Sequence, residues 1–138
     1  MAFVGDILCV SGLAGKVYNA YKDAPDGYKH ISNEVKSLEA MINKCARHFE
    51  RITPSNSDWQ EGQEVLKGCR DILEDLNHLI EKYKILALKK KGLAVTRLKL
   101  GLEDVATLRA RLIFNTGLLN GYIQRSNIPP ITTGYISC

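Results

Sequence analysis

The fold is decided by residues 28–52, which read YKHISNEVKSLEAMINKCARHFERI. Apolar side chains recur in this stretch at alternating intervals of three and four residues. They are Tyr28, Ile31, Val35, Leu38, Ile42, Cys45, Phe49 and Ile52. The repeat places two apolar residues in every seven on one side of a helix, which is typical of a long helix packed lengthwise against others. The polar residues between them are predicted to face water.

Three further helices are predicted around this one, over residues 2–22, about 58–86 and 98–125. The third helix carries a matching apolar stripe at Val65, Cys69, Ile72, Leu76, Leu79, Tyr83 and Leu86, widened by Leu66, Leu73 and Ile80. The fourth is lined by Leu98, Leu102, Val105, Leu108, Leu112, Leu119 and Tyr122 or Ile123. Ser57 and Gln60 form a capping-box pattern at the start of the third helix. The sequence predicts an all-α bundle of about four long helices, in which an apolar N-terminal helix packs against long antiparallel helices. The domain is expected to span residues 1–126, with residues 127–138 as a linker or tail.

The N-terminal helix has an unusual composition. Asp6 is its only charged residue before Lys16, and apolar residues cover more than one face. A helix that is apolar nearly all round is either buried in a core or suited to a membrane, and the sequence leaves both alternatives open. The candidates for membrane insertion are Phe3, Val4, Asp6, Ile7, Leu8, Val10 and Leu13. The small residues that predict close helix packing are Gly5, Ser11, Gly12 and Gly15.

Positive charge is concentrated in one segment of a chain that is otherwise ordinary in composition. The chain has 138 residues, of which 45% are apolar and 25% charged, and a net charge of +4. The basic segment contains Lys82, Lys84, Lys89, Lys90, Lys91, Arg97 and Lys99, without any acid. It is interpreted either as a solvated helix end, which the helix dipole favours, or as a surface for anionic lipid headgroups. Nucleic acid is not favoured, because no aromatic residues lie between Lys84 and Lys99.

The four cysteines show no CxxC pair or regular spacing, so a reducing cytosol is the expected compartment. Neither a secretory signal nor an apolar run long enough for a constitutive membrane span is present.

No catalytic or metal-binding motif is found. His30, His48 and His78 lack the spacing of metal ligands, and each is expected at the surface or its boundary. The acidic residues between Glu61 and Asp75 are interpreted as a solvated helix face. We therefore expect a protein without enzymatic activity, cofactor or metal.

Three segments together carry a resemblance to a known family. They are FVGDILCVSGLAGKVYNAYKDAP at the amino terminus, ISNEVKSLEAMI in the second helix and LKLGLEDVATLRARLIFNTGLLNGYI in the fourth. Over roughly residues 2–125 the chain resembles the HeLo-like N-terminal domains of fungal STAND (NLR-like) receptors. The matching apolar segment runs from Phe3 to Val17, with Asp6 at the position of the family's frequent early acid. The chain departs from the family pattern in its tail, because no receptor NTPase module follows within these residues.

The resemblance implies a fungal signalling domain of programmed cell death and heterokaryon incompatibility. It would be cytoplasmic, would self-associate and, on activation, would act at the plasma membrane through its N-terminal helix. The alternative is a homotypic oligomerisation or adaptor domain of a STAND receptor that does not touch lipid. The expected partners are other copies of the chain, an anionic membrane and a receptor module.

Overall fold

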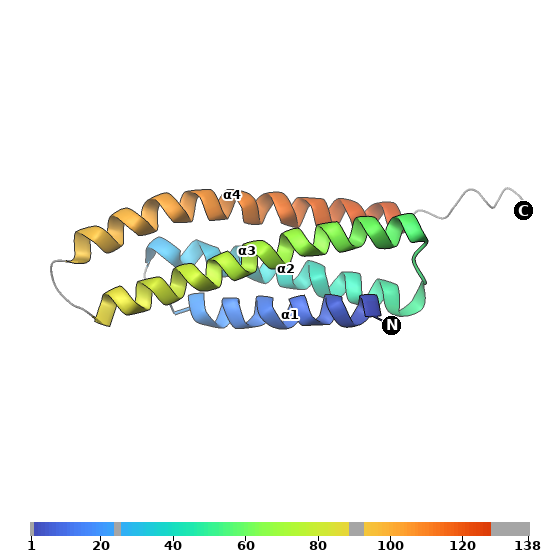
Figure 1. Ribbon diagram of the computed structural model, residues 1–138, viewed down its shortest axis with the longest axis horizontal. Helices are drawn as coiled ribbons and strands as arrows, with labels where there is room; N and C mark the ends of the chain where they lie inside the picture. Colours follow the sequence, from blue (N-terminus) through green and yellow to red (C-terminus); the bar gives the residue numbers. More distant parts are fainter. Residues whose placement is uncertain (1, 24–25, 89–92, 128–138) are drawn as a thin grey trace, which may run out of the picture.

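A computed structural model describes the backbone of residues 2–23, 26–88 and 93–127, and the side chains of residues 3–23, 30–82 and 105–126. Four helices follow one another along the chain. They are α1 (Ala2–Tyr21), α2 (Asp26–Arg51), α3 (Asn56–Leu88) and α4 (Leu93–Asn127). The predicted all-α bundle of four long helices is confirmed (Figure 1). The predicted tail after Asn127 lies outside the described residues.

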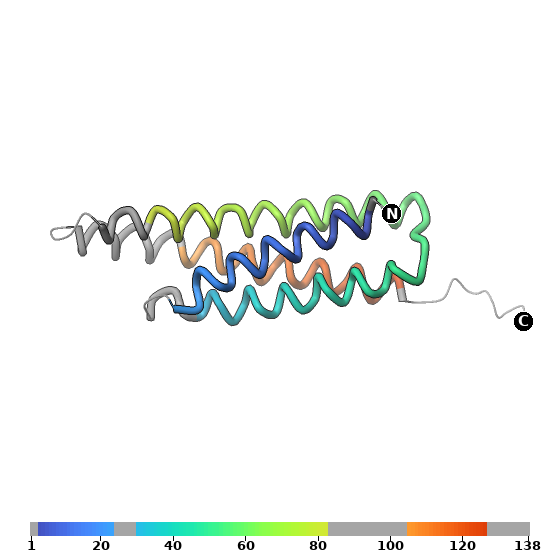
Figure 2. Tube along the Cα trace, turned by 90° about the horizontal axis from the view of Figure 1, so that it is seen from below, coloured from blue at the N-terminus to red at the C-terminus, as the bar shows by residue number. Residues whose placement is uncertain are grey.

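The helices pack in the cyclic order α1, α2, α4, α3, rather than in chain order. α1 contacts α2 and α3, α4 contacts the same two helices, and the pairs α1/α4 and α2/α3 face each other across the core. Figure 1 shows α1 and α4 on opposite sides of the bundle, and in Figure 2, which is seen from below, α1 passes in front of α4. Successive helices run antiparallel. Because α2 and α3 face each other across the core, the connection between them crosses the end of the bundle diagonally. As a result, α1 lies beside a parallel α3, and α2 lies beside a parallel α4.

The apolar stripes predicted from the sequence form the core. The buried members of the predicted stripe on α2 are Ile31, Val35, Leu38, Ile42, Cys45 and Phe49. On α3 they are Leu66, Cys69, Ile72, Leu73, Leu76, Leu79 and Ile80, and on α4 Leu108, Leu112, Leu119, Tyr122 and Ile123. Ile52 is an exception, because α2 ends at Arg51 and the next side chain is 47% exposed.

Two helix starts differ from the prediction. The amide of Asp58 donates to Oγ of Ser55 at 3.2 Å, and the amide of Trp59 donates to the Ser55 carbonyl at 2.8 Å. The N-cap of α3 is therefore Ser55, and the capping box predicted at Ser57 is wrong. The start of α4 at Leu93, ahead of the predicted Leu98, follows from the absence of a helix breaker after Gly92.

An aromatic cluster fills the core at the end where α1 begins. The ring centroids of Phe3 and Phe49 are 5.2 Å apart, and those of Phe49 and Tyr122 are 5.8 Å apart. The Tyr122 hydroxyl donates to the Asp58 carbonyl at 2.8 Å. His48 belongs to this region, since it is only 7% exposed and its ring packs edge-on against Phe49. The prediction of a surface or boundary position is therefore wrong for His48, whereas His30 and His78 are exposed.

Candidate functional site

α1 has one buried face and one exposed face. Its buried side chains are Phe3, Ile7, Val10, Ala14, Val17 and Tyr21, spaced three or four residues apart. Val4 and Leu13 are half-buried against the same core. Leu8, in contrast, is 50% exposed, and Asp6 lies at the surface. The membrane-insertion candidates are thus divided between the core and the surface of the bundle. The sequence pattern did not reveal this division, because residues opposite the buried stripe are small rather than charged.

Polar contacts hold α1 along its length. Oγ of Ser11 donates to Oδ1 of Asn43 on α2 at 2.5 Å, and Nε2 of Gln63 on α3 donates to Asp6 at 3.3 Å. Near the end of the helix, the buried Tyr21 hydroxyl donates to the Leu76 carbonyl at 2.6 Å. These contacts reach both neighbouring helices, so α1 is an integral part of the bundle.

The four small residues proposed for close packing do not share one role. A Cβ added at Gly5 or Gly12 would meet no atom within 4 Å, so neither glycine brings α1 close to another helix of the bundle. A Cβ at Gly15 would meet Glu39 at 3.2 Å, and Ser11 forms the hydrogen bond to α2. Sequence reasoning missed two tight positions on α3, namely Gly62, where an added Cβ would clash with Tyr122 and Phe3, and Gly68, where it would clash with Asn115. The only available signal was a glycine within an otherwise strong helix, at a cost of about 1 kcal/mol relative to alanine.

The basic segment falls mostly outside the described side chains. Lys82 is exposed on α3. Lys84, Arg97 and Lys99 lie on the described helical backbone without described side chains, and Lys89, Lys90 and Lys91 lie outside the described residues altogether. By topology the segment belongs to the connection between α3 and α4. The end of α3 and the start of α4 lie at the end of the bundle opposite the start of α1 (Figure 1), so Phe3 and Lys82 are not brought together.

The charged face of α3 is joined to α4 by ion pairs. Arg111 donates to Asp75 at 2.6 Å, and Arg125 is paired with Glu61. Within α3, Lys67 donates to Asp71 at 2.8 Å, and this hydrogen bond lowers the pKa of Asp71. The acidic side chains interpreted as a solvated face therefore also fasten α3 to α4.

A similar pair joins α2 to α4. Nε and Nη2 of Arg109 donate to the two carboxylate oxygens of Glu34, at 2.9 and 2.6 Å. Such a two-pronged contact fixes the rotation of α4 about its own axis as well as its distance from α2.

The outward face of α4 was not anticipated. Ile113, Phe114 and Leu118 are 56%, 65% and 41% exposed. The predicted buried stripe did not include them, but no other role was predicted for them. The available signal was the presence of more apolar residues in this helix than one stripe can hold. These three side chains form the exposed apolar patch of α4.

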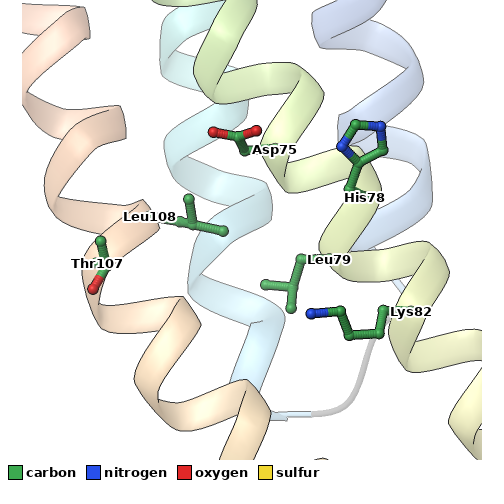
Figure 3. Close-up of a pocket in the computed structure, with 6 residues that line it drawn as sticks. All are labelled: Asp75, His78, Leu79, Lys82, Thr107 and Leu108. Carbon is green, nitrogen blue, oxygen red and sulfur yellow. The ribbon is translucent and has the colours of Figure 1, made fainter.

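A small hollow lies between α3 and α4, with a volume of about 220 Å³. Figure 3 shows Asp75, His78, Leu79 and Lys82 projecting from α3, and Thr107 and Leu108 from α4. Pockets for small molecules usually measure about 300–1,000 Å³. The hollow is therefore small for a substrate, and Asp75 is already paired with Arg111.

The described cysteines differ in their environment. Cys45 and Cys69 are buried, and burial raises the pKa of each thiol to about 12. Cys9 is exposed on α1. Since the thiolate is the reactive form, the two core thiols behave as apolar side chains.

Among the residues described, no group of three or more His, Cys, Asp or Glu side chains is placed to hold a metal ion. Within the same part of the chain, none of the helices has both the length and the hydropathy required to cross a membrane. Comparisons with protein families, curated proteins and solved structures find no match to this chain.

Proposed function

We propose that the chain is a non-enzymatic signalling module that works by associating with other copies of itself while α1 remains in the bundle. The observation that carries the proposal is the burial of Phe3, Ile7 and Val10 in the core shared by all four helices. The resemblance to HeLo-like domains supports a role in fungal cell-death or immune-type signalling, in the cytoplasm and next to an NLR-like receptor.

The cost of releasing α1 supports this choice. Each large apolar side chain contributes about 1.5–3 kcal/mol when buried, and α1 buries five of them, namely Phe3, Ile7, Val10, Val17 and Tyr21. Their loss would cost on the order of 10 kcal/mol as an upper estimate. Whole domains are stable by only about 5–15 kcal/mol. Release of α1 would therefore unfold the bundle unless another surface received these side chains.

A second candidate function is membrane action of α1 after assembly, as the resemblance implies. It is favoured by the outward side of the first half of α1, where Gly5, Leu8, Cys9 and Gly12 are exposed and uncharged beside the single acid Asp6. An anionic plasma membrane would be the target, with the basic segment as a further contact.

The two candidates are separated by locking α1 to α2. Ser11 and Asn43 are in hydrogen-bond contact, so Ser11→Cys with Asn43→Cys, in a Cys9→Ser background, places two thiols at this crossing. Self-association is measured by light scattering after gel filtration, and membrane action by dye release from anionic liposomes. The Ser11→Cys single variant in the same background controls for the substitution.

Association of both the oxidised and the reduced protein, without dye release, is the expected result. Dye release by the reduced protein that stops on oxidation would replace the first proposal by the second. A chain that stays monomeric at every concentration would refute self-association.

A further inference from the structure

The outward face of α4 differs from the outward faces of α2 and α3. Besides Ile113, Phe114 and Leu118, its exposed residues include Ala106, Ala110 and Gly117. From residue 105 to residue 124 the exposed positions of this helix carry no charge, whereas α3 exposes Glu64, Lys67, Arg70, Glu74 and Glu81. Single exposed apolar residues are common, but a contiguous group marks an interaction site.

The charged residues of this part of α4 are turned sideways. Arg109 is bound to Glu34 on the α2 side, and Arg111 is bound to Asp75 on the α3 side. Each edge of the apolar patch therefore carries one base and one acid. Such a neutral edge gives little attraction to an anionic membrane or a nucleic acid, whereas it can meet an identical edge without repulsion.

Contacts within one copy of the chain do not explain why residue 117 is a glycine. A Cβ at this position would meet no atom within 4 Å, yet a glycine inside a helix costs about 1 kcal/mol relative to alanine. It lies within the apolar patch, one turn after Ile113 and next to Leu118. A glycine at this place leaves room for a large side chain of another molecule.

We propose that the apolar patch of α4 binds the same patch of a second copy, with the two α4 helices antiparallel. This inference rests on the proposed function and names its surface. A two-fold axis between residues 115 and 116 would place Phe114 of each copy opposite Gly117 of the other, and Ile113 opposite Leu118. The large Phe114 then faces the space left by Gly117, and Ile113 packs against Leu118, so that a single surface is complementary to itself, as a two-fold interface requires.

The same arrangement brings together edges whose charges are already paired within each copy. In an antiparallel pair about this axis, the α2 edge of one copy meets the α2 edge of the other. Arg109 and Arg111 stay bound to Glu34 and Asp75 of their own copy, so no unpaired charge is brought into the contact. The base and acid within each edge make this surface compatible with itself.

The test is sedimentation of the full chain over a wide concentration range. Two variants place a charge in the patch, Phe114→Glu and Leu118→Glu, and Gly117→Leu fills the space expected for Phe114 of the other copy. Trp59→Glu is the matched control, because Trp59 is an exposed apolar side chain of 44% exposure on α3. Since all four positions are exposed, folding is expected to persist, and circular dichroism verifies it.

The wild-type chain and the Trp59→Glu variant are expected to dimerise alike. Each patch variant should weaken dimerisation by on the order of a hundredfold or more, because the dimer would bury two unpaired carboxylates or two clashing side chains. A wild-type dimer that is unaffected by the patch variants would overturn this surface while leaving self-association intact. A monomeric wild-type chain would overturn both.

Discussion

Replacement of Gly62 by alanine tests the packing at the aromatic end of the bundle. Gly62 is buried in α3, and an ideal Cβ would lie 2.5 Å from the Tyr122 hydroxyl oxygen and 2.6 Å from Cζ of Phe3. Real side-chain atoms do not approach so closely, so both rings would have to move. The Tyr122 ring is stacked on Phe49, and its hydroxyl is bound to the Asp58 carbonyl. Any shift therefore disturbs contacts with α2 as well as α3.

The expected magnitude is the difference between one stabilising contribution and two destabilising ones. Alanine is favoured over glycine inside a helix by about 1 kcal/mol. Overpacking a core costs about 1–3 kcal/mol, and weakening the hydrogen bond of Tyr122 costs about 1 kcal/mol more. Gly62→Ala should thus lower the free energy of unfolding by about 2 kcal/mol. For a domain of this size, that corresponds to a fall in Tm of about 6–10 °C.

Urea and thermal unfolding followed by circular dichroism measure this change. Gly12→Ala is the matched control, because Gly12 is exposed and its Cβ would meet no atom; it should raise stability by up to about 1 kcal/mol. Adding Tyr122→Phe to Gly62→Ala removes the closest contact, so the two changes should be less than additive. A Gly62→Ala protein as stable as Gly12→Ala would refute the packing described here.

Three further predictions follow from other contacts. The pKa of Cys45 and of Cys69 is raised to about 12 by burial, so the folded state holds these protons more tightly than the unfolded chain, whose thiols titrate near pH 8.5. Their contribution to the free energy of unfolding is intact below that pH and declines toward pH 12 by roughly 1.4 kcal/mol per thiol and pH unit. Urea titrations at pH 8–10.5 should show this decline in stability. The double variant Cys45→Ala with Cys69→Ala should show a smaller decline. Removing the ion pair by Arg109→Ala should lower the free energy of unfolding by about 0.5–1 kcal/mol. A double-mutant cycle with Glu34→Gln should show a coupling energy that weakens as salt is added. A coupling energy of zero would mean that the pair does not contribute to stability. Tyr21→Phe should cost about 1 kcal/mol through the lost hydrogen bond to Leu76, seen as a lower urea midpoint, and an unchanged midpoint would contradict the role of this bond in holding α1.

The helices themselves were predictable because their signals are local. The three-four spacing from Ile31 to Phe49 requires one buried side of α2, whatever its neighbours are, and all members of that stripe with described side chains except Ile52 are buried. The ends were less predictable. Ser55 and Ser57 are both acceptable N-caps, and only the hydrogen bond to Asp58 shows that Ser55 caps α3.

The candidate surfaces were less predictable, because they depend on which neighbours a helix has. The composition of α1 was compatible with burial and with a membrane, and the structure divides its apolar residues between the core and the surface. The same limitation applies to glycine. Gly12 and Gly62 are equally visible in the sequence, yet only Gly62 lies where two aromatic rings converge.

The sequence by itself determined four helices and, for the second, third and fourth of them, the residues that form the common core, since hydrophobic periodicity acts along one helix at a time. The tertiary structure decided the cyclic order α1, α2, α4, α3, because that order depends on contacts between distant segments such as Glu34 with Arg109. It also decided that Ile113, Phe114 and Leu118 face outward. The sequence shows that these residues are apolar, but whether they are exposed depends on which side chains the other helices cover.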